Sequence, residues 1–293
     1  MKKLCYLGIS MHPAAREKLE IYADVSENQG LLPNADAAIV YSPSPGWISG
    51  AYDKLKIIAC HSMGGEDLEG WARGKNIKVF ESTRIWMTVA EHTLALLLSA
   101  IRNIPAADRD VKDGRWKETD LKIRYSGYDM YGKTVGIWGL GKIGKHAAKL
   151  LQGFGVKIVY NDIVRLPEET EQELQVSYLP RESFFPVLDY LLVLLPLNEK
   201  TRGIMDAAVF SLLKKGAVLV NTARAALIDE EAMKRAVEGG IIAAAGLDVL
   251  WEEGKDQSEW ITGNRRIIAV PHLGGSTREC DMELVDAVLE TIR

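Results

Sequence analysis

The stretch VGIWGLGKIGKHAAKLL, residues 135–151, decides the fold expected of this chain. An apolar run leads into Gly139, Gly141 and Gly144 in GxGxxG spacing, and a helix rich in alanine, leucine and lysine follows. Here the first glycine permits a tight turn, the second lets the backbone approach a pyrophosphate, and the third lets the helix lie close to the strand. The helix N-terminus then offers unpaired N–H groups to the phosphates. The stretch therefore predicts a dinucleotide-binding βαβ unit.

The strand after this loop ends at Asp162, near the offset where a carboxylate can accept hydrogen bonds from both ribose hydroxyls. A carboxylate there also repels a 2′-phosphate, which favours NAD over NADP, although the nearby Arg165 weakens that preference. An aspartate in an ordinary strand-end turn is the alternative interpretation. We predict NAD (NADH) as the cofactor and regard NADP as the less favoured one.

Short runs rich in Val, Ile, Leu and Ala alternate along the chain with amphipathic stretches of about 10–15 residues, a pattern typical of βα units. The first series of expected strands comprises residues 4–10, 36–42, 56–62 and 77–82, and the second comprises 134–140, 157–162, 190–196, 217–223, 243–249 and 266–272. Helices are expected near 13–23, 47–54, 66–74, 88–104 and 276–291, whereas the polar segment 105–133 reads as irregular.

This order predicts an α/β protein of two Rossmann-like or flavodoxin-like domains, each with a doubly wound parallel sheet, and a cleft between them. Residues 1–92 and 275–293 are expected to form an outer, discontinuous domain that binds the substrate. Residues 93–274 are expected to form the inserted NAD-binding domain. A length of 293 residues is consistent with two domains that each have a core.

Composition excludes several other classes of protein. The net charge of −4 and a pI near 5.8 give no electrostatic reason to expect nucleic acid or an anionic membrane as a partner. The longest apolar runs fall short of the roughly 20 residues that a membrane helix needs, and the first ten residues lack the features of a secretory signal. Cys5, Cys60 and Cys280 have no CxxC spacing, so free thiols in a reducing cytoplasm are expected.

Three charged or titratable side chains stand near the carboxyl ends of the second series of strands. Arg224 follows 217–223, Asp248 lies within 243–249, and His272 is the last residue of 266–272. Ligands of open α/β sheets bind beyond these strand ends. A guanidinium can hold a carboxylate by forked hydrogen bonds, and an imidazolium can donate a proton to a carbonyl oxygen. Together with Glu253, which could orient the imidazole, the set suits hydride transfer to a 2-oxo acid.

Each of these residues also has a purely structural interpretation. His272 could be a hydrogen-bonded core histidine, Arg224 a surface charge, and Asp248 a cap or ion-pair partner. A metal site made of Asp248, Glu253 and His272 is less favoured because no short ligand spacing supports it, so no metal is predicted. His61, His92 and His146 are interpreted as structural, although His61 could itself make a minor contact with substrate.

The motifs in order resemble those of the D-isomer-specific 2-hydroxyacid dehydrogenases. The matching blocks are GLGKIG, LPLNEKTRGIM, VNTARAALIDEEAM, GLDVLWEE and PHLGGST, preceded by the helix VAEHTLALLLSAIRNI. The resemblance implies a catalytic set of Arg224, Glu253 and His272. It implies NAD contacts from Gly139, Gly141, Lys142, Ile143, Gly144, Asp162, Leu195, Pro196, Thr201, Thr222, Ala223, Asp248, His272 and Gly274. It also implies that Met63, Gly64 and Gly65 bind the substrate together with Arg224 and His272, and that the chain is a homodimer.

The sequence departs from the family pattern at several positions. Ala225 and Ala226 replace glycine after Arg224, which would restrict the turn, and Gly254 follows Glu253 in place of proline. The C-terminal helix also ends the chain sooner than in most members. A dinucleotide-sensing, corepressor-like binding protein could retain the same residues and stays open as an alternative, whereas an NAD enzyme acting on a nucleoside does not need this set.

The apolar Trp86 and Met87 and the loop 42–47 favour a small or hydrophobic 2-oxo acid over a phosphorylated one.

Overall fold

The structure, a computed structural model, describes residues 2–41, 43, 52–61 and 66–293. The chain divides into two compact units, unit 1 (Met1–Thr88 with Gly275–Arg293) and unit 2 (Val89–Gly274). The first division falls a few residues before the predicted boundary, because residues 89–92 already belong to helix α3 (Ile85–Ile101), which packs on the sheet of unit 2. The assignment of substrate binding to unit 1 remains a prediction.

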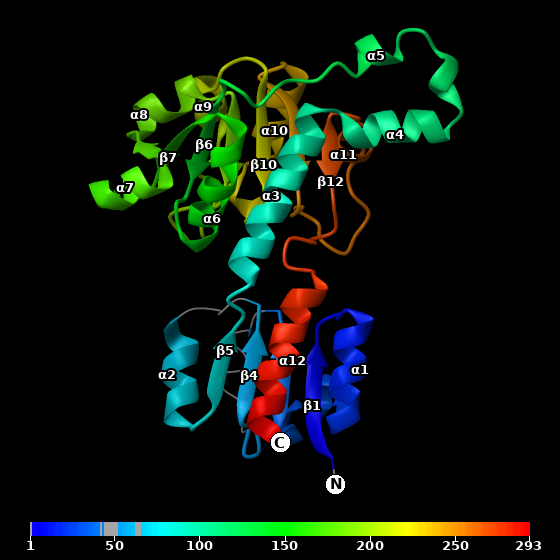
Figure 1. Cartoon of the computed structure of the whole chain (residues 1–293), viewed down its shortest axis with the longest axis vertical. Helices are drawn as coiled ribbons and strands as arrows, with labels where there is room; N and C mark the ends of the chain where they lie inside the picture. Colours follow the sequence, from blue (N-terminus) through cyan, green and yellow to red (C-terminus); the bar gives the residue numbers. More distant parts are fainter. Residues whose placement is uncertain (1, 42, 44–51, 62–65) are drawn as a thin grey trace. The chain divides into compact units, whose positions relative to one another are not determined.

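Unit 1 contains a five-stranded parallel sheet in the order β2-β1-β3-β4-β5 (Figure 1). Its strands are β1 (Lys3–Gly8), β2 (Ala23–Ser26), β3 (Ala37–Val40), β4 (Ile57–Cys60) and β5 (Lys78–Glu81). Strands β3 and β4 are buried throughout, as expected of central parallel strands covered on both faces. The helical elements are α1 (Pro13–Tyr22), the 3₁₀ turn η1 (Gln29–Asn34), α2 (Glu66–Gly74) and α12 (Arg278–Ile292), and α1 and α12 pack together on one face of the sheet.

Unit 2 contains a seven-stranded parallel sheet in the order β12-β11-β10-β9-β6-β7-β8. Its strands are β6 (Thr134–Trp138), β7 (Lys157–Asn161), β8 (Val176–Tyr178), β9 (Tyr190–Val193), β10 (Ala217–Asn221), β11 (Ile242–Leu247) and β12 (Ile267–Ala269). The chain order reverses between β6 and β9, which is the topological switch point where ligands of doubly wound sheets bind. The two apolar clusters on the faces of this sheet include Phe184, Phe185 and Phe210 on one side and Leu97, Ile101 and Tyr160 on the other.

The helices of unit 2 are short apart from the Leu-rich α3. They are α4 (Ile104–Lys112), α5 (Leu121–Arg124), α6 (Lys142–Leu151), α7 (Glu168–Leu174), α8 (Arg181–Phe184), α9 (Ala207–Leu212), α10 (Glu230–Glu238) and α11 (Glu259–Thr262), with 3₁₀ turns η3 (Arg115–Lys117), η4 (Gln152–Phe154), η5 (Phe185–Val187) and η6 (Ala225–Leu227). Figure 1 shows α4 and α5 extending away from the sheet of this unit.

The two doubly wound parallel sheets confirm the predicted fold class, and every predicted strand is present with shifts of a few residues at its ends. Three features differ from expectation. The edge strands β2 and β8 were not predicted, and residues 105–133 are not wholly irregular, since they hold most of α4 and all of α5. The helix expected at 47–54 lies mostly outside the described residues, and residues 52–54 are not helical.

The three cysteines are free and buried, and burial raises the pKa of the Cys5 and Cys60 thiols to about 12. Among the described residues, no helix combines the length and apolar character needed to span a bilayer. The cytoplasmic location expected from the free thiols stays a prediction.

Candidate active site

Three neighbouring strands of unit 2 bring two of the predicted catalytic residues and one predicted cofactor residue to one edge of the sheet. Arg224 follows β10, Asp248 follows β11 and His272 follows β12, and these strands are adjacent in the order β12-β11-β10. Because all three are parallel, their carboxyl ends lie at the same edge. The glycine loop follows β6 at this edge as well, separated from β10 by β9.

The imidazole of His272 is paired with Glu253. Its Nδ1 atom lies 3.2 Å from Oε1 and 3.3 Å from Oε2 of the carboxylate. The histidine side chain is 24% exposed and the glutamate side chain 50%, so the pair can be reached from solvent. Both residues line a cavity of about 700 Å³ together with Asp248, Leu250, Val270 and Pro271. An imidazole held on one ring nitrogen beside a cavity is suited to proton transfer.

Asp248 is buried, and its carboxylate binds the chain directly after His272. Its Oδ1 accepts hydrogen bonds from the N–H of Leu273 at 2.7 Å, and its Oδ2 from that of Gly274 at 3.0 Å. The ring of His92 on α3 also lies 3.0 Å from Oδ1 through its Nε2. Asp248 therefore anchors the segment that carries His272, and its contact with the cofactor stays a prediction.

Arg224 is half-buried, and its guanidinium donates a 2.7 Å hydrogen bond to the carbonyl of Ala223. The buried Asn221 fixes this turn from both sides, since its Nδ2 donates to the carbonyl of Arg224 and its Oδ1 accepts from the N–H of Ala223. The backbone of Arg224 is extended (φ −146°) and η6 begins at Ala225. Neither conformation requires glycine, so the alanines that depart from the family pattern do not restrict this turn.

Gly254 accounts for the second departure from the family pattern. Its φ of +78° lies in the left-handed region, which proline cannot adopt because its ring fixes φ near −65°. The chain after Glu253 therefore turns along a path that depends on glycine. The Glu253–His272 contact is retained with this turn.

The glycine loop has the geometry that a pyrophosphate requires. Gly139 has φ +100°, and a Cβ there would lie 2.8 Å from the backbone of Leu194. A Cβ on Gly144 would lie 2.5 Å from the carbonyl oxygen of Gly139, whereas Gly141, the N-cap of α6, faces open space. The first N–H groups of α6 have no intrahelical acceptor and are available to phosphate oxygens. The loop thus fits the dinucleotide pyrophosphate.

Asp162 follows β7 beside this loop, and its Oδ2 accepts a 2.7 Å hydrogen bond from the N–H of Leu140. Its carboxylate retains lone pairs for a ribose. Arg165, the residue that complicated the choice between NAD and NADP, is bound to Glu171 through two hydrogen bonds of 3.0 Å. Hydrogen bonds from Arg165 and Tyr160 also hold the pKa of Glu171 below its usual range. The cation near Asp162 therefore has a carboxylate partner of its own.

The other predicted cofactor residues lie in the turns after β9 and β10. The hydroxyl of Thr201 donates to the carbonyl of Pro196 at 2.6 Å, and that of buried Thr222 is 2.7 Å from the hydroxyl of Thr93. These hydroxyls shape the turns on which Leu195 and Ala223 lie. The predicted substrate residues Met63, Gly64 and Gly65 lie outside the described residues.

Sequence reasoning missed Asn221, Thr93 and the contact of His92. Asn221 offered a signal, because a polar side chain at the end of a fully buried strand must find partners. Thr93 and His92 offered none, since their partners lie more than one hundred residues away in the sequence.

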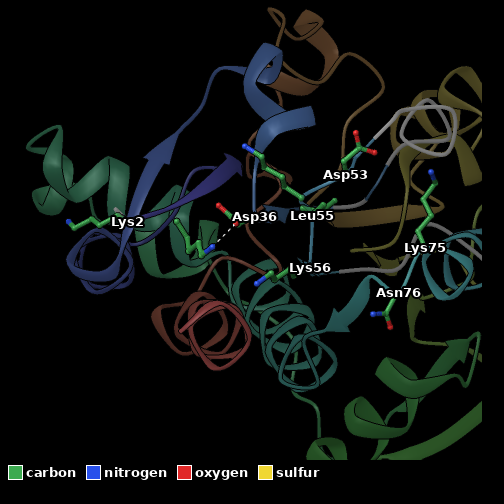
Figure 2. A pocket seen from close by; sticks show the side chains of 9 residues that line it. Lys2, Asp36, Asp53, Leu55, Lys56, Lys75 and Asn76 are labelled. Carbon is green, nitrogen blue, oxygen red and sulfur yellow. Dashed lines mark ion pairs between the residues drawn. The ribbon is translucent and has the colours of Figure 1, made fainter.

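A second hollow, of about 560 Å³, lies in unit 1 and is unrelated to this site (Figure 2). Its lining includes Lys3, Asp36, Lys56 and Asn76, which stand at or just before the first residues of strands. This is the amino edge of the sheet, opposite to the edge where α/β proteins bind ligands. Its lysine side chains are exposed, and Lys3 is paired with Asp36 at 3.4 Å, as on an ordinary solvated surface.

Comparison with known proteins agrees with this geometry. Residues 94–274 match the NAD binding domain of the D-isomer specific 2-hydroxyacid dehydrogenases. A glyoxylate reductase from Korarchaeum cryptofilum is 31% identical over 282 residues, covering 96% of this chain and 82% of that protein. A D-3-phosphoglycerate dehydrogenase from Mycobacterium bovis is 35% identical, but the chain spans only 49% of its length. The crystal structure of a glyoxylate reductase from Paecilomyes thermophila has a TM-score of 0.77 at 27% identity, covering 100% of this chain and 96% of that one.

Proposed function

The chain belongs to the D-isomer specific 2-hydroxyacid dehydrogenase family, and from this premise we propose that His272, Glu253 and Arg224 carry its reaction. It is an NAD-dependent dehydrogenase that interconverts 2-oxo and 2-hydroxy acids. NAD(H), when bound, accepts or supplies the hydride. The Glu253–His272 pair beside a cavity at the carboxyl edge of the sheet is the observation that carries the proposal.

In the direction of reduction, His272 donates a proton to the carbonyl oxygen of the 2-oxo acid, which becomes the hydroxyl of the product. Glu253 holds Nδ1, so Nε2 delivers the proton. Arg224 has N–H donors beyond the one bound to Ala223, and these hold the substrate carboxylate beside the reacting carbonyl. In the direction of oxidation, the same imidazole, now neutral, takes the proton back.

Replacement of His272 tests this assignment. We expect His272→Gln to lower kcat by about 10²–10⁴-fold, the usual contribution of a positioned general acid, while NADH binding measured by fluorescence is retained. His12→Gln is the matched control, since the His12 side chain caps α1 through its Nδ1. Turnover by His272→Gln at the wild-type rate would show that another group supplies the proton.

The substrate is proposed to be a small or hydrophobic 2-oxo acid. Met87, at the start of α3, is an apolar side chain that is 40% exposed, whereas the loop 42–47 lies outside the described residues except at position 43. An absorbance assay with NADH and a series of glyoxylate, pyruvate, longer aliphatic, aromatic and phosphorylated 2-oxo acids measures kcat/KM for each. Preference for the phosphorylated acids would contradict the proposal, and tight NADH binding without oxidation by any acid would favour the dinucleotide-sensing alternative.

We further propose that the chain forms a homodimer through the segment containing α4 and α5. Trp116, Ile123 and Tyr128 of this segment are 74%, 79% and 50% exposed, an unusual concentration of apolar surface. The segment is ordered by its own unit, because the buried Asp110 accepts hydrogen bonds from Tyr125 and Arg265. Light scattering should give the mass of a dimer for the wild type and of a monomer for Ile123→Asp. A wild-type monomer would contradict this.

A further inference from the structure

The segment that carries His272 adopts a backbone conformation that needs support. His272 has φ +54°, in the left-handed region that side chains with a Cβ rarely adopt. Its N–H is shared between the backbone carbonyls of Asp248 at 2.9 Å and Val270 at 3.0 Å, and the next two N–H groups, of Leu273 and Gly274, donate to the Asp248 carboxylate. Three successive N–H groups thus donate to Asp248, two of them to its side chain. The orientation of the His272 ring depends on where Asp248 is held.

The carboxylate of Asp248 is in turn held by α3. The Nε2 atom of His92 lies 3.0 Å from Oδ1, the oxygen that also receives the Leu273 N–H, and Asp248 is only 1% exposed. Because carboxylate oxygens accept hydrogen bonds, we assign the Nε2–H of His92 as the donor. A buried carboxylate requires such donors, and His92 is the one side chain among the described residues that supplies one.

The position of His92 is fixed by helix packing. Leu96, one turn further along α3, lies so close to β11 that a Cβ on Gly246 would be 2.9 Å from its Cβ. Asp248 follows β11 directly. The close approach of α3 to this strand therefore sets the distance between His92 and Asp248.

The same contact joins the two places where the chain passes between the units. The chain leaves unit 1 after Thr88, four residues before His92, and leaves unit 2 after Gly274, which is bound to Asp248. We propose that His92 is a positioning residue that acts through Asp248 to hold the His272 segment and to tie both connections to the sheet of unit 2. This rests on the proposed role of His272 as the proton donor.

Two amide substitutions of His92 test the proposal, because only one of the two side chains is long enough to bring its amide nitrogen to Asp248. The Nε2 of glutamine in His92→Gln replaces the histidine Nε2, whereas the shorter asparagine of His92→Asn cannot reach Asp248. We expect His92→Asn to lower kcat by about 10- to 100-fold, as displacement of a reacting group by about 1 Å does, and His92→Gln to restore most of that loss. The NADH dissociation constant and KM should change little in either variant. Glu91→Gln, at an exposed position of the same helix, is the control.

The outcomes separate this inference from the proposed function. If His272→Gln loses activity while His92→Asn matches the wild type, the inference is overturned and the proposed function stands. If both His92 variants lose kcat equally, the reach of the donor is irrelevant and the positioning role is overturned. Full activity of His272→Gln would overturn the proposed function itself. Both amide variants keep a polar side chain in place of the imidazole, and circular dichroism checks that they fold.

Discussion

Each unit carries a histidine–carboxylate pair near the carboxyl edge of its sheet, and the two pairs differ in burial. In unit 1, His61 follows β4 and its Nε2 lies 3.4 Å from Asp281 of α12, with both side chains about 5% exposed. In unit 2, His272 pairs with Glu253 at 3.2 Å, and the side chains are 24% and 50% exposed. Both pairs consist of an imidazole and a carboxylate. They differ in access to solvent and ligand, and this difference distinguishes the structural pair from the proposed catalytic pair.

The buried pair keeps its proton across the neutral range. Burial alone would lower the pKa of His61, but Asp281 and the neighbouring Cys280 outweigh it and raise the pKa to about 9. Neither ring nitrogen has a well-aligned hydrogen bond among the described residues, so charge is the main attraction to Asp281. A histidine that stays protonated and enclosed cannot exchange a proton with substrate at each turnover. Its attraction to Asp281 stabilises the packing of α12 on the sheet.

The largest effect is expected from breaking the buried pair. Asp281→Asn should lower the free energy of unfolding by about 3 kcal/mol, because it removes the counter-charge of an enclosed imidazolium. It also removes the charge-assisted hydrogen bond from the N–H of His12. The kcat of the folded protein should not change. Calorimetry and steady-state assays measure the two quantities.

Asp286→Asn is the matched control for this change, since Asp286 pairs with Lys18 on the exposed side of the same helix. Exposed pairs contribute about 0–1 kcal/mol, so little loss is expected. Equal losses of unfolding free energy in Asp281→Asn and Asp286→Asn would show that the contribution of these ion pairs to stability does not depend on burial.

The next effect concerns pH. Because the folded pKa of His61 is raised above its unfolded value, its stabilisation is complete below about pH 6.5 and is lost as the pH rises through about 9. We expect the wild type to lose about 2–3 kcal/mol between pH 7 and pH 10 from this group. Urea unfolding at a series of pH values measures the slope. If the free energy of unfolding of Asp281→Asn changes with pH as steeply as that of the wild type, groups other than His61 cause the change.

These comparisons show where the sequence was informative. The glycine loop and the long Val/Ile/Leu strands could be predicted because local pattern determines them. Strands β2 and β8, with sequences ADVS and VSY, could not, since only pairing with β1 and β7 makes these short edge segments strands. His92 was interpreted as structural because its partner lies 156 residues away. Helix α4 was missed although Pro105 stands at its first turn, a recognised start signal.

A smaller effect, on activity alone, is expected from the exposed pair. Glu253→Gln should lower kcat by about 10- to 100-fold, because the amide orients the His272 ring without stabilising its charged form. The midpoint of thermal unfolding should not change, since the pair is open to solvent. Glu252→Gln, at the exposed neighbouring position that pairs with Lys255, is the control. A loss of stability in Glu253→Gln would show that the Glu253–His272 pair stabilises the fold, as the buried pair does.

The smallest effect is expected where the chain departs from the family pattern beside Arg224. Ala225→Gly restores the usual glycine, but Arg224 is extended and Ala225 begins a 3₁₀ turn, so neither uses the freedom that glycine adds. The variant should lose about 0.5–1 kcal/mol of stability, because glycine gives the unfolded chain more conformational entropy. Its kcat and KM should match the wild type, since Asn221 fixes the turn through backbone contacts that the substitution leaves in place. A rise in kcat would instead show that the Arg224 turn must move during the reaction, and that alanine restrains it.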